Sequence, residues 1–234
     1  MCQDKYCTIV GEKCQHYFSS IVFIGISLEP FMFSDELEKM IAEAATSEKF
    51  DYSANPNKNW KRVVFAPGRF QPPHAGHEDM IRELVMFARK KKAEPVIVVV
   101  KGSAISEKNP LTGESRKKFL QAIFKGIKIV LADNPFKVVE EDFYPQGMMP
   151  VGIVAGSDRV AGYQRLGEYY HIPGFEVKSL KRDPDAEGSA AYSATQVRDK
   201  VKEKDEEGFL DMMPRSMSQQ TAERMYAELS KIIK

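Results

Sequence analysis

The sequence has few cysteines, and they are confined to one end. Cys2, Cys7 and Cys14 all fall within the first fourteen residues, so no internal disulfide framework can support the remainder of the chain. This distribution favours a reducing, cytoplasmic setting. The spacing of Cys7, Cys14 and His16 matches no common zinc site.

An excess of charge of one sign and a long apolar run are also missing. Lys plus Arg number 34 against 33 for Asp plus Glu, so no overall basic field recruits nucleic acid. The run ARKKK (88–92) ends an expected helix, where cations interact favourably with the helix dipole. The apolar stretch YFSSIVFIGISLEPFMF is too short, and too interrupted by Ser, Gly, Glu and Pro, for a membrane span. We therefore expect neither membrane insertion nor a strong nucleic-acid partner.

What the sequence does contain is a regular alternation of strand and helix patterns. Strands are expected at 62–67, 95–102, 151–156 and 175–180, with a further strand at either 127–131 or 136–140. Helical spacing covers 75–92, 113–125, 158–170 and 194–204. Because the strands are apolar on both faces, the pattern predicts an α/β, Rossmann-like doubly wound parallel sheet with helices on both sides.

Regions with other patterns flank this alternation. Residues 34–46 have helical spacing with Ser34 at the N-cap, whereas 50–59 are rich in Asn, Pro and Ser and indicate a linker or surface loop. The sequence thus predicts an N-terminal appendage and linker over 1–59 and one domain over 60–234. A final amphipathic helix is expected from its apolar spacing, at Ala222, Met225, Leu229 and Ile232.

The stretch GRFQPPHAGH (68–77) joins the first expected strand of the domain to its helix. In doubly wound sheets, ligands bind beyond the carboxyl ends of the strands. Gly68 would let the backbone approach a ligand closely, and the first N–H groups of the helix favour an anion. His74 and His77, one turn apart, would point the same way and suit a polyphosphate. Taken alone, two such histidines are more often a cap and a surface residue.

A second stretch, YSATQVRD (192–199), carries a compatible set of groups. Ser193 and Thr195 stand at an expected helix start, and Arg198 follows Thr195 by one turn. Hydroxyls, backbone N–H groups and a guanidinium would then converge on one spot. The pattern S-x-T-x-x-R is commonplace by itself, and it also describes a capped helix with a solvated arginine.

Together and in this order, over roughly residues 61–200, these stretches resemble the H-x-G-H nucleotidyltransferase superfamily. GRFQPPHAGH is similar to the signature of archaeal-type nicotinamide mononucleotide adenylyltransferases, whereas cytidylyltransferases usually begin G-T-F-D. NPLTGESR (109–116) is similar to N-P-F-T-x-x-E-R, with Leu111 in place of Phe and a shifted Gly and Glu. AGSDRV (155–160) falls where relatives carry a G-x-D. The acidic stretch 181–191 and the helical stretch near 32–44 look like nucleotidyltransferase-like proteins of large bacterial viruses.

The resemblance implies transfer of an adenylyl group from ATP to a phosphate-bearing acceptor, nicotinamide mononucleotide before others, with release of pyrophosphate. The attacking phosphate oxygen is already anionic, so no base is needed, and catalysis consists of positioning and charge stabilisation. Mg²⁺ would accompany ATP. The implied catalytic residues are His74, His77 and Arg198. The implied nucleotide contacts are Gly68, Arg69, Phe70, Gly76, Ser193 and Thr195.

Three further residues are implied for substrate binding: Asn109, Arg116 and Asp158. Arg116 fits a solvated helix position as well as a phosphate contact, and Asp158 fits a helix N-cap as well as a carboxylate at the site. Two other functions stay open, namely a CTP-dependent cytidylyltransferase and a non-catalytic nucleotide-binding or structural module. The expected location is the cytoplasm, or the host cytoplasm for a virus-encoded protein. An oligomer is compatible with the sequence.

Overall fold

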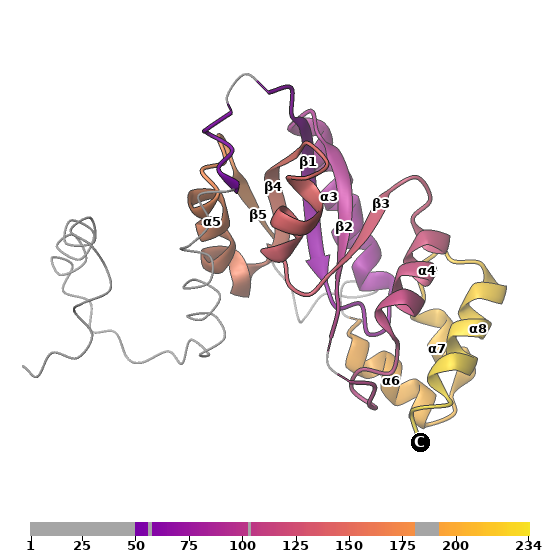
Figure 1. The fold of residues 1–234 in the computed structure, drawn as a ribbon. Coiled ribbons are helices and arrows are strands. Elements are labelled where there is room, and N and C mark those ends of the chain that lie inside the picture. The colour runs from indigo at the N-terminus through magenta and orange to yellow at the C-terminus, as the bar shows by residue number, and fades with distance from the viewer. Residues whose placement is uncertain (1–49, 56–57, 103, 181–191) are drawn as a thin grey trace, which may run out of the picture. The chain divides into compact units, whose positions relative to one another are not determined.

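The computed structural model describes residues 50–55, 58–102, 104–180 and 192–234. Their centre is a five-stranded parallel sheet with the order β3-β2-β1-β4-β5 (Figure 1). The strands are β1 (Lys61–Gly68), β2 (Glu94–Val100), β3 (Lys128–Ala132), β4 (Met148–Gly156) and β5 (Glu176–Leu180). The predicted α/β, Rossmann-like fold is thereby confirmed. The strand order reverses direction at β1, so the carboxyl ends of β1 and β4 flank the crevice where ligands bind in such sheets.

The helices agree with the expected positions except in two places. They are α3 (Ala75–Lys90), α4 (Gly113–Ile123), α5 (Val160–Tyr169), α6 (Ala194–Lys202), α7 (Glu206–Asp211), α8 (Gln219–Leu229), the π-helix η3 (Val139–Phe143) and the 3-10 turn η4 (Ser157–Arg159). The strand alternative at 136–140 is wrong, because this segment leads into η3 and the third strand is β3. The six-residue helix α7 was not expected, since so short a helix shows no periodicity.

Both faces of the sheet are buried at its central strands, as their apolar sequences require. In β1, Val63 and Phe65 pack in a core with residues of η3 and α5, whereas Val64 and Ala66 pack with residues of α3 and α4. Successive side chains of a strand point to opposite faces, so a strand covered on both sides is apolar throughout.

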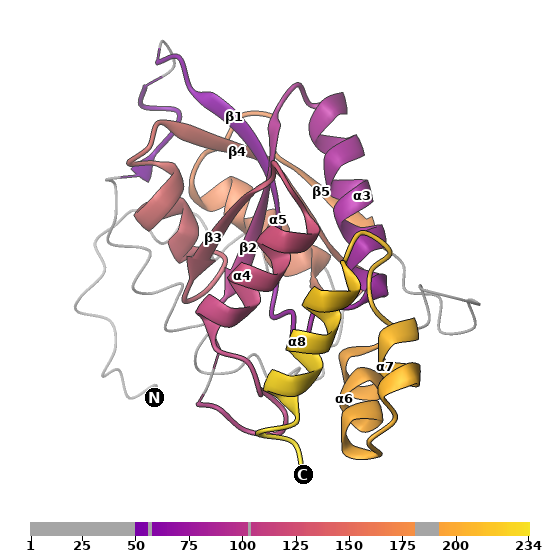
Figure 2. The same ribbon diagram turned by 90° about the vertical axis from the view of Figure 1, so that its right-hand side faces the viewer.

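The C-terminal helices form a lobe at the carboxyl end of the sheet (Figures 1 and 2). A separate apolar core joins α4 and the segment before it to α6, α7 and α8; it includes Leu111, Phe119, Val197, Phe209, Met225 and Leu229. The expected C-terminal helix is α8, and its buried face holds Ala222, Met225 and Leu229 as predicted. The lobe therefore has a core of its own, and it borders the expected ligand crevice, where the Ala75 N–H donates to the Met212 carbonyl.

The segment before β1 packs at the opposite, amino end of the sheet. Tyr52 is 1% exposed, and its hydroxyl donates to the Met148 carbonyl at 2.8 Å. Its ring lies 4.7 Å from that of Trp60 and 5.2 Å from that of Tyr144. The expected linker is thus a loop whose Tyr52 belongs to the core. The division into 1–59 and 60–234 stays a prediction.

Several expected features lie outside the described residues: the helix at 34–46, the cysteines, and the acidic stretch 181–191. Within the part of the chain that is described, none of the helices has both the length and the apolarity needed to cross a membrane.

Candidate functional site

The turn after β1 is shaped by an internal ring. Phe70 has a positive φ of 50° and is 1% exposed. A Cβ added to Gly68 would lie 2.7 Å from Cε2 of Phe70, so the phenyl ring fills the space that glycine leaves. Gly68 was expected to open the backbone to a ligand; here it makes room for Phe70. The Phe70 ring in turn packs against His77, with 4.8 Å between centroids, and so helps to orient that histidine.

The two histidines cap the helix that they begin. His74 is the N-cap of α3, and its Nδ1 accepts from the Gly76 N–H at 3.1 Å. His77, at the third helical position, accepts the His74 N–H on its own Nδ1 at 3.1 Å. This reciprocal pair is a capping box built from histidines. The rings stack loosely, with 3.9 Å between their centroids.

Capping fixes the tautomer of both imidazoles. An Nδ1 that accepts a backbone N–H carries no proton, so in each neutral ring the proton resides on Nε2. Each ring is therefore an Nε2–H donor whose orientation is set by its other nitrogen. Capping and hydrogen-bond donation to a phosphate, which the sequence presents as rival roles, use different atoms of the same side chain.

The backbone N–H groups at the start of α3 are already engaged. Ala75 N–H donates to the Met212 carbonyl at 2.9 Å, Gly76 N–H to His74 Nδ1, and His77 N–H to the His74 carbonyl at 2.9 Å. The expected anion site on these N–H groups is therefore wrong for this conformation. The C-terminal lobe supplies one of the acceptors, so α3 offers imidazole donors in place of backbone donors.

The second stretch begins α6. Ser193 is its N-cap and accepts the Gln196 N–H at 3.3 Å, while the Gln196 side chain accepts the Ser193 N–H at 2.8 Å. Ala194 and Thr195 are the first two residues of α6, so their N–H groups have no partner within the helix. Backbone donors at the positive end of a helix favour anions. The start of α6 thus retains the property that was expected of α3.

The two stretches meet. Arg198 Nη1 donates to the Gln71 carbonyl at 2.6 Å across a separation of 127 residues, and Arg198 Nη2 donates to Thr195 Oγ1 at 3.0 Å. A Cβ on Gly76 would lie 3.1 Å from the Tyr192 carbonyl, so glycine permits this approach. Burial lowers the pKa of Arg198; Asp199 opposes this shift and Arg69 adds to it. Five N–H donors belong to a guanidinium, and three remain beyond these two bonds.

Arg116 is an internal residue. Its side chain is 2% exposed; Nη1 donates to the Arg69 carbonyl and, at 2.8 Å, to the Val100 carbonyl, while Nε donates to the Thr112 carbonyl at 3.1 Å. Burial first, and then nearby Arg69, lower its pKa. The solvated position considered for Arg116 is therefore wrong. None of these three bonds uses Nη2, so a phosphate contact through Nη2 would leave them in place.

Gln71 has a structural role that its sequence context does not indicate. It is 6% exposed, its Nε2 donates to the Leu111 carbonyl at 2.6 Å, and its Oε1 accepts the Leu111 N–H at 3.0 Å. The side chain thus pairs with a backbone unit as a neighbouring strand would. The only sequence signal was its presence in the GRFQP run.

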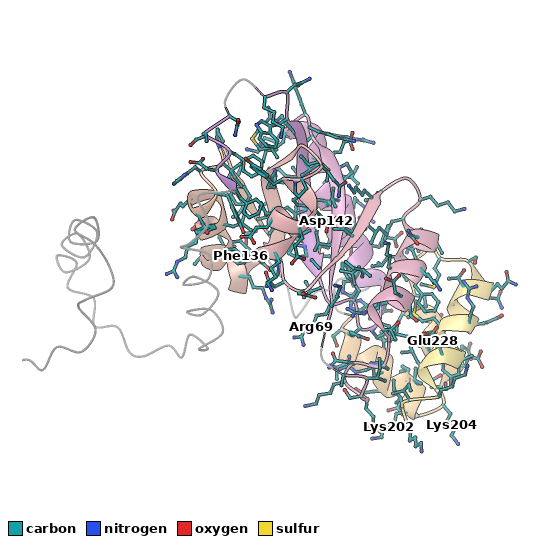
Figure 3. All side chains as sticks on the ribbon, in the orientation of Figure 1. Arg69, Phe136, Asp142, Lys202, Lys204 and Glu228 are labelled. Carbon is teal, nitrogen blue, oxygen red and sulfur yellow. The ribbon has the colours of Figure 1, made fainter. Side chains whose placement is uncertain are left out.

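Asn109, Asp158 and Arg69 are the remaining expected site residues. Asn109 forms a tight turn with Ser106, exchanging backbone hydrogen bonds of 2.9 and 3.2 Å. Asp158 lies in η4, directly after β4, but its side chain is outside the described set; the residue preceding α5 at the N-cap is Arg159. Arg69 is exposed and lies where the sheet meets the C-terminal lobe (Figure 3).

The corner is cationic. Arg69, Arg116 and Arg198 are close enough that Arg69 lowers the pKa of both other guanidinium groups. The described residues include no group of three or more His, Cys, Asp or Glu able to hold a metal ion. The corner can therefore bind a polyanion through neutral imidazole and cationic guanidinium donors.

A groove of about 360 Å³ is lined by Ala75, Asp79, Arg82 and Tyr192 among others. By helical spacing it lies on the side of α3 opposite His77.

Comparison with known proteins agrees with this geometry. A family model described as Cytidylyltransferase-like matches residues 65–200, which include both stretches. No curated protein matches the chain.

The solved structures to which the chain is similar share little sequence with it. Thermotoga maritima TmcAL bound with alpha-thio ATP is 15% identical over 73% of this chain, with a TM-score of 0.47; the match spans only 56% of TmcAL. Plasmodium falciparum nicotinic acid mononucleotide adenylyltransferase, complexed with APC, is 13% identical over 74% of this chain and 98% of its own, with a TM-score of 0.48.

Proposed function

Because the chain belongs to the cytidylyltransferase-like family of nucleotidyltransferases, we propose that it transfers an adenylyl group from ATP to a phosphate-bearing acceptor, nicotinamide mononucleotide before others. One observation carries this proposal: Arg198 of α6 donates to the Gln71 carbonyl, in the loop that leads to His74. The start of α6 and the paired histidines therefore border the same corner of the sheet.

The chemistry follows from these donors. An oxygen of the acceptor phosphate attacks the α-phosphorus of ATP; a new P–O bond forms, the bond to the β-phosphate breaks, and its electron pair leaves on pyrophosphate. The Nε2–H groups of His74 and His77 donate to phosphate oxygens as negative charge builds on them. Because the attacking oxygen is anionic, neither histidine has to remove a proton.

The leaving pyrophosphate is assigned to the start of α6. The remaining N–H groups of Arg198 and the backbone N–H groups of Ala194 and Thr195 would hold it. Ser193 serves as the cap that aligns these donors. Mg²⁺ would enter with the triphosphate as part of the substrate.

The choice of ATP over CTP rests on the sequence. Arg69, Phe70 and Gln71 match the adenylyl branch of the resemblance, where cytidylyltransferases usually have Thr, Phe and Asp. The alternative is cytidylyl transfer from CTP, since the family model that matches the chain is described as Cytidylyltransferase-like. The acceptor rests on the resemblance of GRFQPPHAGH and NPLTGESR to nicotinamide mononucleotide adenylyltransferases.

Release of pyrophosphate from the full chain tests the proposal. MgATP and MgCTP are each combined with nicotinamide mononucleotide and with alcohol phosphates, and pyrophosphate is measured. We expect MgATP with nicotinamide mononucleotide to be the active pair, and the His77→Gln variant to be the matched inactive control. Faster turnover of CTP with an alcohol phosphate would overturn the adenylyl assignment. Thermal stabilisation by nucleotide without pyrophosphate release from any pair would identify a binding module.

A further inference from the structure

One buried residue joins three segments at the catalytic corner. The side chain of Gln71 bonds both the N–H and the carbonyl of Leu111, ahead of α4, and its own carbonyl accepts from Arg198 on α6. Leu111 packs in the apolar core that also contains Val197 of α6. The loop after β1, the segment before α4 and helix α6 are therefore linked in a closed circuit that passes through Gln71.

The circuit fixes the direction of a charged group. Both ends of the planar Gln71 amide are bonded, and Arg116 holds the preceding carbonyl of Arg69 from inside the domain. The loop 69–71 is thus held at its first and last residues, and the Gln71 carbonyl has a defined direction. A guanidinium is a rigid fork, so the acceptor of one of its N–H groups sets where the others point.

We infer that Gln71 is a positioning residue for Arg198: its clamp on Leu111 holds the carbonyl that aims the guanidinium at the leaving phosphates. The inference rests on the proposed function of the same corner. It predicts that breaking the clamp impairs the reaction only through Arg198, although Gln71 itself touches no substrate.

The variant Gln71→Glu breaks the clamp with almost no change of shape. It keeps an acceptor for the Leu111 N–H but replaces the donor to the Leu111 carbonyl with an oxygen. We expect kcat/KM for MgATP and the dissociation constant of MgATP each to worsen by about tenfold, the effect of misdirecting one charge-assisted contact. Gln146→Glu is the matched control, since Gln146 is exposed and bonds Lys128 at the other end of the sheet; its kinetics should equal those of the wild type.

A double-mutant cycle with Arg198→Lys separates positioning from general support. If Gln71 acts through Arg198, Gln71→Glu should change kcat/KM by less than about twofold in the Arg198→Lys background, because coupled residues are not additive. A full tenfold loss in both backgrounds would overturn the inference. Should Gln71→Glu show no cooperative melting transition, Gln71→Met supplies an uncharged variant of similar length for the same cycle.

Lowering the pH should restore part of the activity of Gln71→Glu. If Gln71 acts by positioning Arg198, this recovery requires Arg198; if Gln71 only supports the fold, it does not. A protonated carboxyl has an O–H that can again donate to the Leu111 carbonyl. The kcat/KM of Gln71→Glu relative to wild type should therefore rise as the pH falls and the introduced carboxyl becomes protonated. Burial favours this protonation, whereas the nearby guanidinium groups of Arg69, Arg116 and Arg198 oppose it. This rise should be absent in the Arg198→Lys background, and an equal rise there would count against the inference.

The measurements distinguish this inference from the proposed function. The cycle can be read from MgATP affinity alone, by calorimetry, without turnover. Wild type that binds and turns over ATP but gives an additive cycle contradicts the inference only. Wild type that binds ATP without turnover, and gives a non-additive cycle in affinity, supports the inference and contradicts the proposed activity. Failure to bind ATP would overturn both.

Discussion

The two ends of the sheet differ in the kinds of side chain that they bury. At the amino end, the rings of Phe50, Tyr52, Trp60 and Tyr144 pack on one another with 4.7 to 5.3 Å between centroids. At the carboxyl end, buried polar side chains lie beside the apolar ones. The described residues contain four buried polar or charged residues, Gln71, His74, Arg116 and Thr221, and the first three belong to the loop after β1 and its immediate neighbours.

This difference distinguishes groups that mainly stabilise the fold from groups that hold hydrogen-bond donors in a fixed direction. Aromatic packing buries a large apolar area and does not require a particular hydrogen-bond geometry. A buried polar group contributes little net stability even when it is fully bonded, but it has a defined direction and is costly to disturb. The carboxyl end is therefore organised to hold donors in place, and the amino end to hold the domain together. Variants at the two ends should differ in which property they change.

The largest expected effect comes from Arg116→Met. The variant leaves the Arg69 and Val100 carbonyl oxygens without this donor, and each buried unsatisfied group costs about 1 to 3 kcal/mol. We expect the free energy of unfolding in urea to fall by about 2 to 5 kcal/mol. Arg116→Lys, which keeps the charge without the fork, should fall in between. If Arg116→Met loses less than about 1 kcal/mol of stability and raises the KM for the acceptor, the result would support the phosphate-binding role that the sequence predicts for Arg116.

The next effect concerns the paired roles of His77. His77→Ala removes both the cap acceptor and the Nε2–H donor, whereas His77→Gln keeps an acceptor at the third helical position, where glutamine is common in capping boxes. Both variants should lower kcat by about 10² or more, the usual loss for one donor to a developing charge. The melting temperature of His77→Gln should stay near that of the wild type.

This pair of variants can also refute the assignment. Near-normal turnover in His77→Gln, with impaired stability in His77→Ala, would mean that the histidine serves the helix alone. The carboxyl end would then resemble the amino end in function, and the contrast between them would be lost.

Arg198→Lys should have a smaller effect of the same kind. Lysine preserves the charge but cannot donate to the Gln71 carbonyl, Thr195 and phosphates together. We expect kcat/KM to fall by about 10- to 100-fold, or roughly 1.5 to 3 kcal/mol of transition-state stabilisation, with little change in stability. A variant with unchanged rate and unchanged ATP affinity would show that the phosphates are held elsewhere.

The sequence predicts the framework of this corner because its signals are local. Strands that are apolar on both faces, and a Gly-to-His turn between the first strand and its helix, establish the fold and the position of the crevice. These features depend on residues adjacent in the chain. That GRFQPPHAGH and YSATQVRD meet is implied by the family resemblance that they carry together.

The contacts that decide roles are not local, and the sequence does not predict them. An arginine one turn into α4 has the same spacing whether it faces solvent or the carbonyl oxygens at the ends of β1 and β2; the structure shows the second for Arg116. The Gln71 clamp reaches Leu111 across 40 residues. The N–H groups of Gly76 and His77 are taken by His74 itself, and the Ala75 N–H is taken by the Met212 carbonyl of a lobe whose packing no local pattern encodes.

The smallest expected effect tests the amino end. Tyr52→Phe removes only the hydroxyl that donates to the Met148 carbonyl; the ring and its aromatic contacts remain. Burial, and then Tyr144, raise the pKa of Tyr52, so the hydroxyl is neutral in ordinary buffers and the lost bond is an uncharged one. Such a bond contributes about 1 kcal/mol, and we expect urea unfolding to show a loss of that size. The kcat and KM for ATP should not change, because Tyr52 lies at the end of the sheet away from His77 and Arg198. A change in turnover without a change in stability would mean that the two ends of the sheet are coupled, and that the division between stability and direction does not hold.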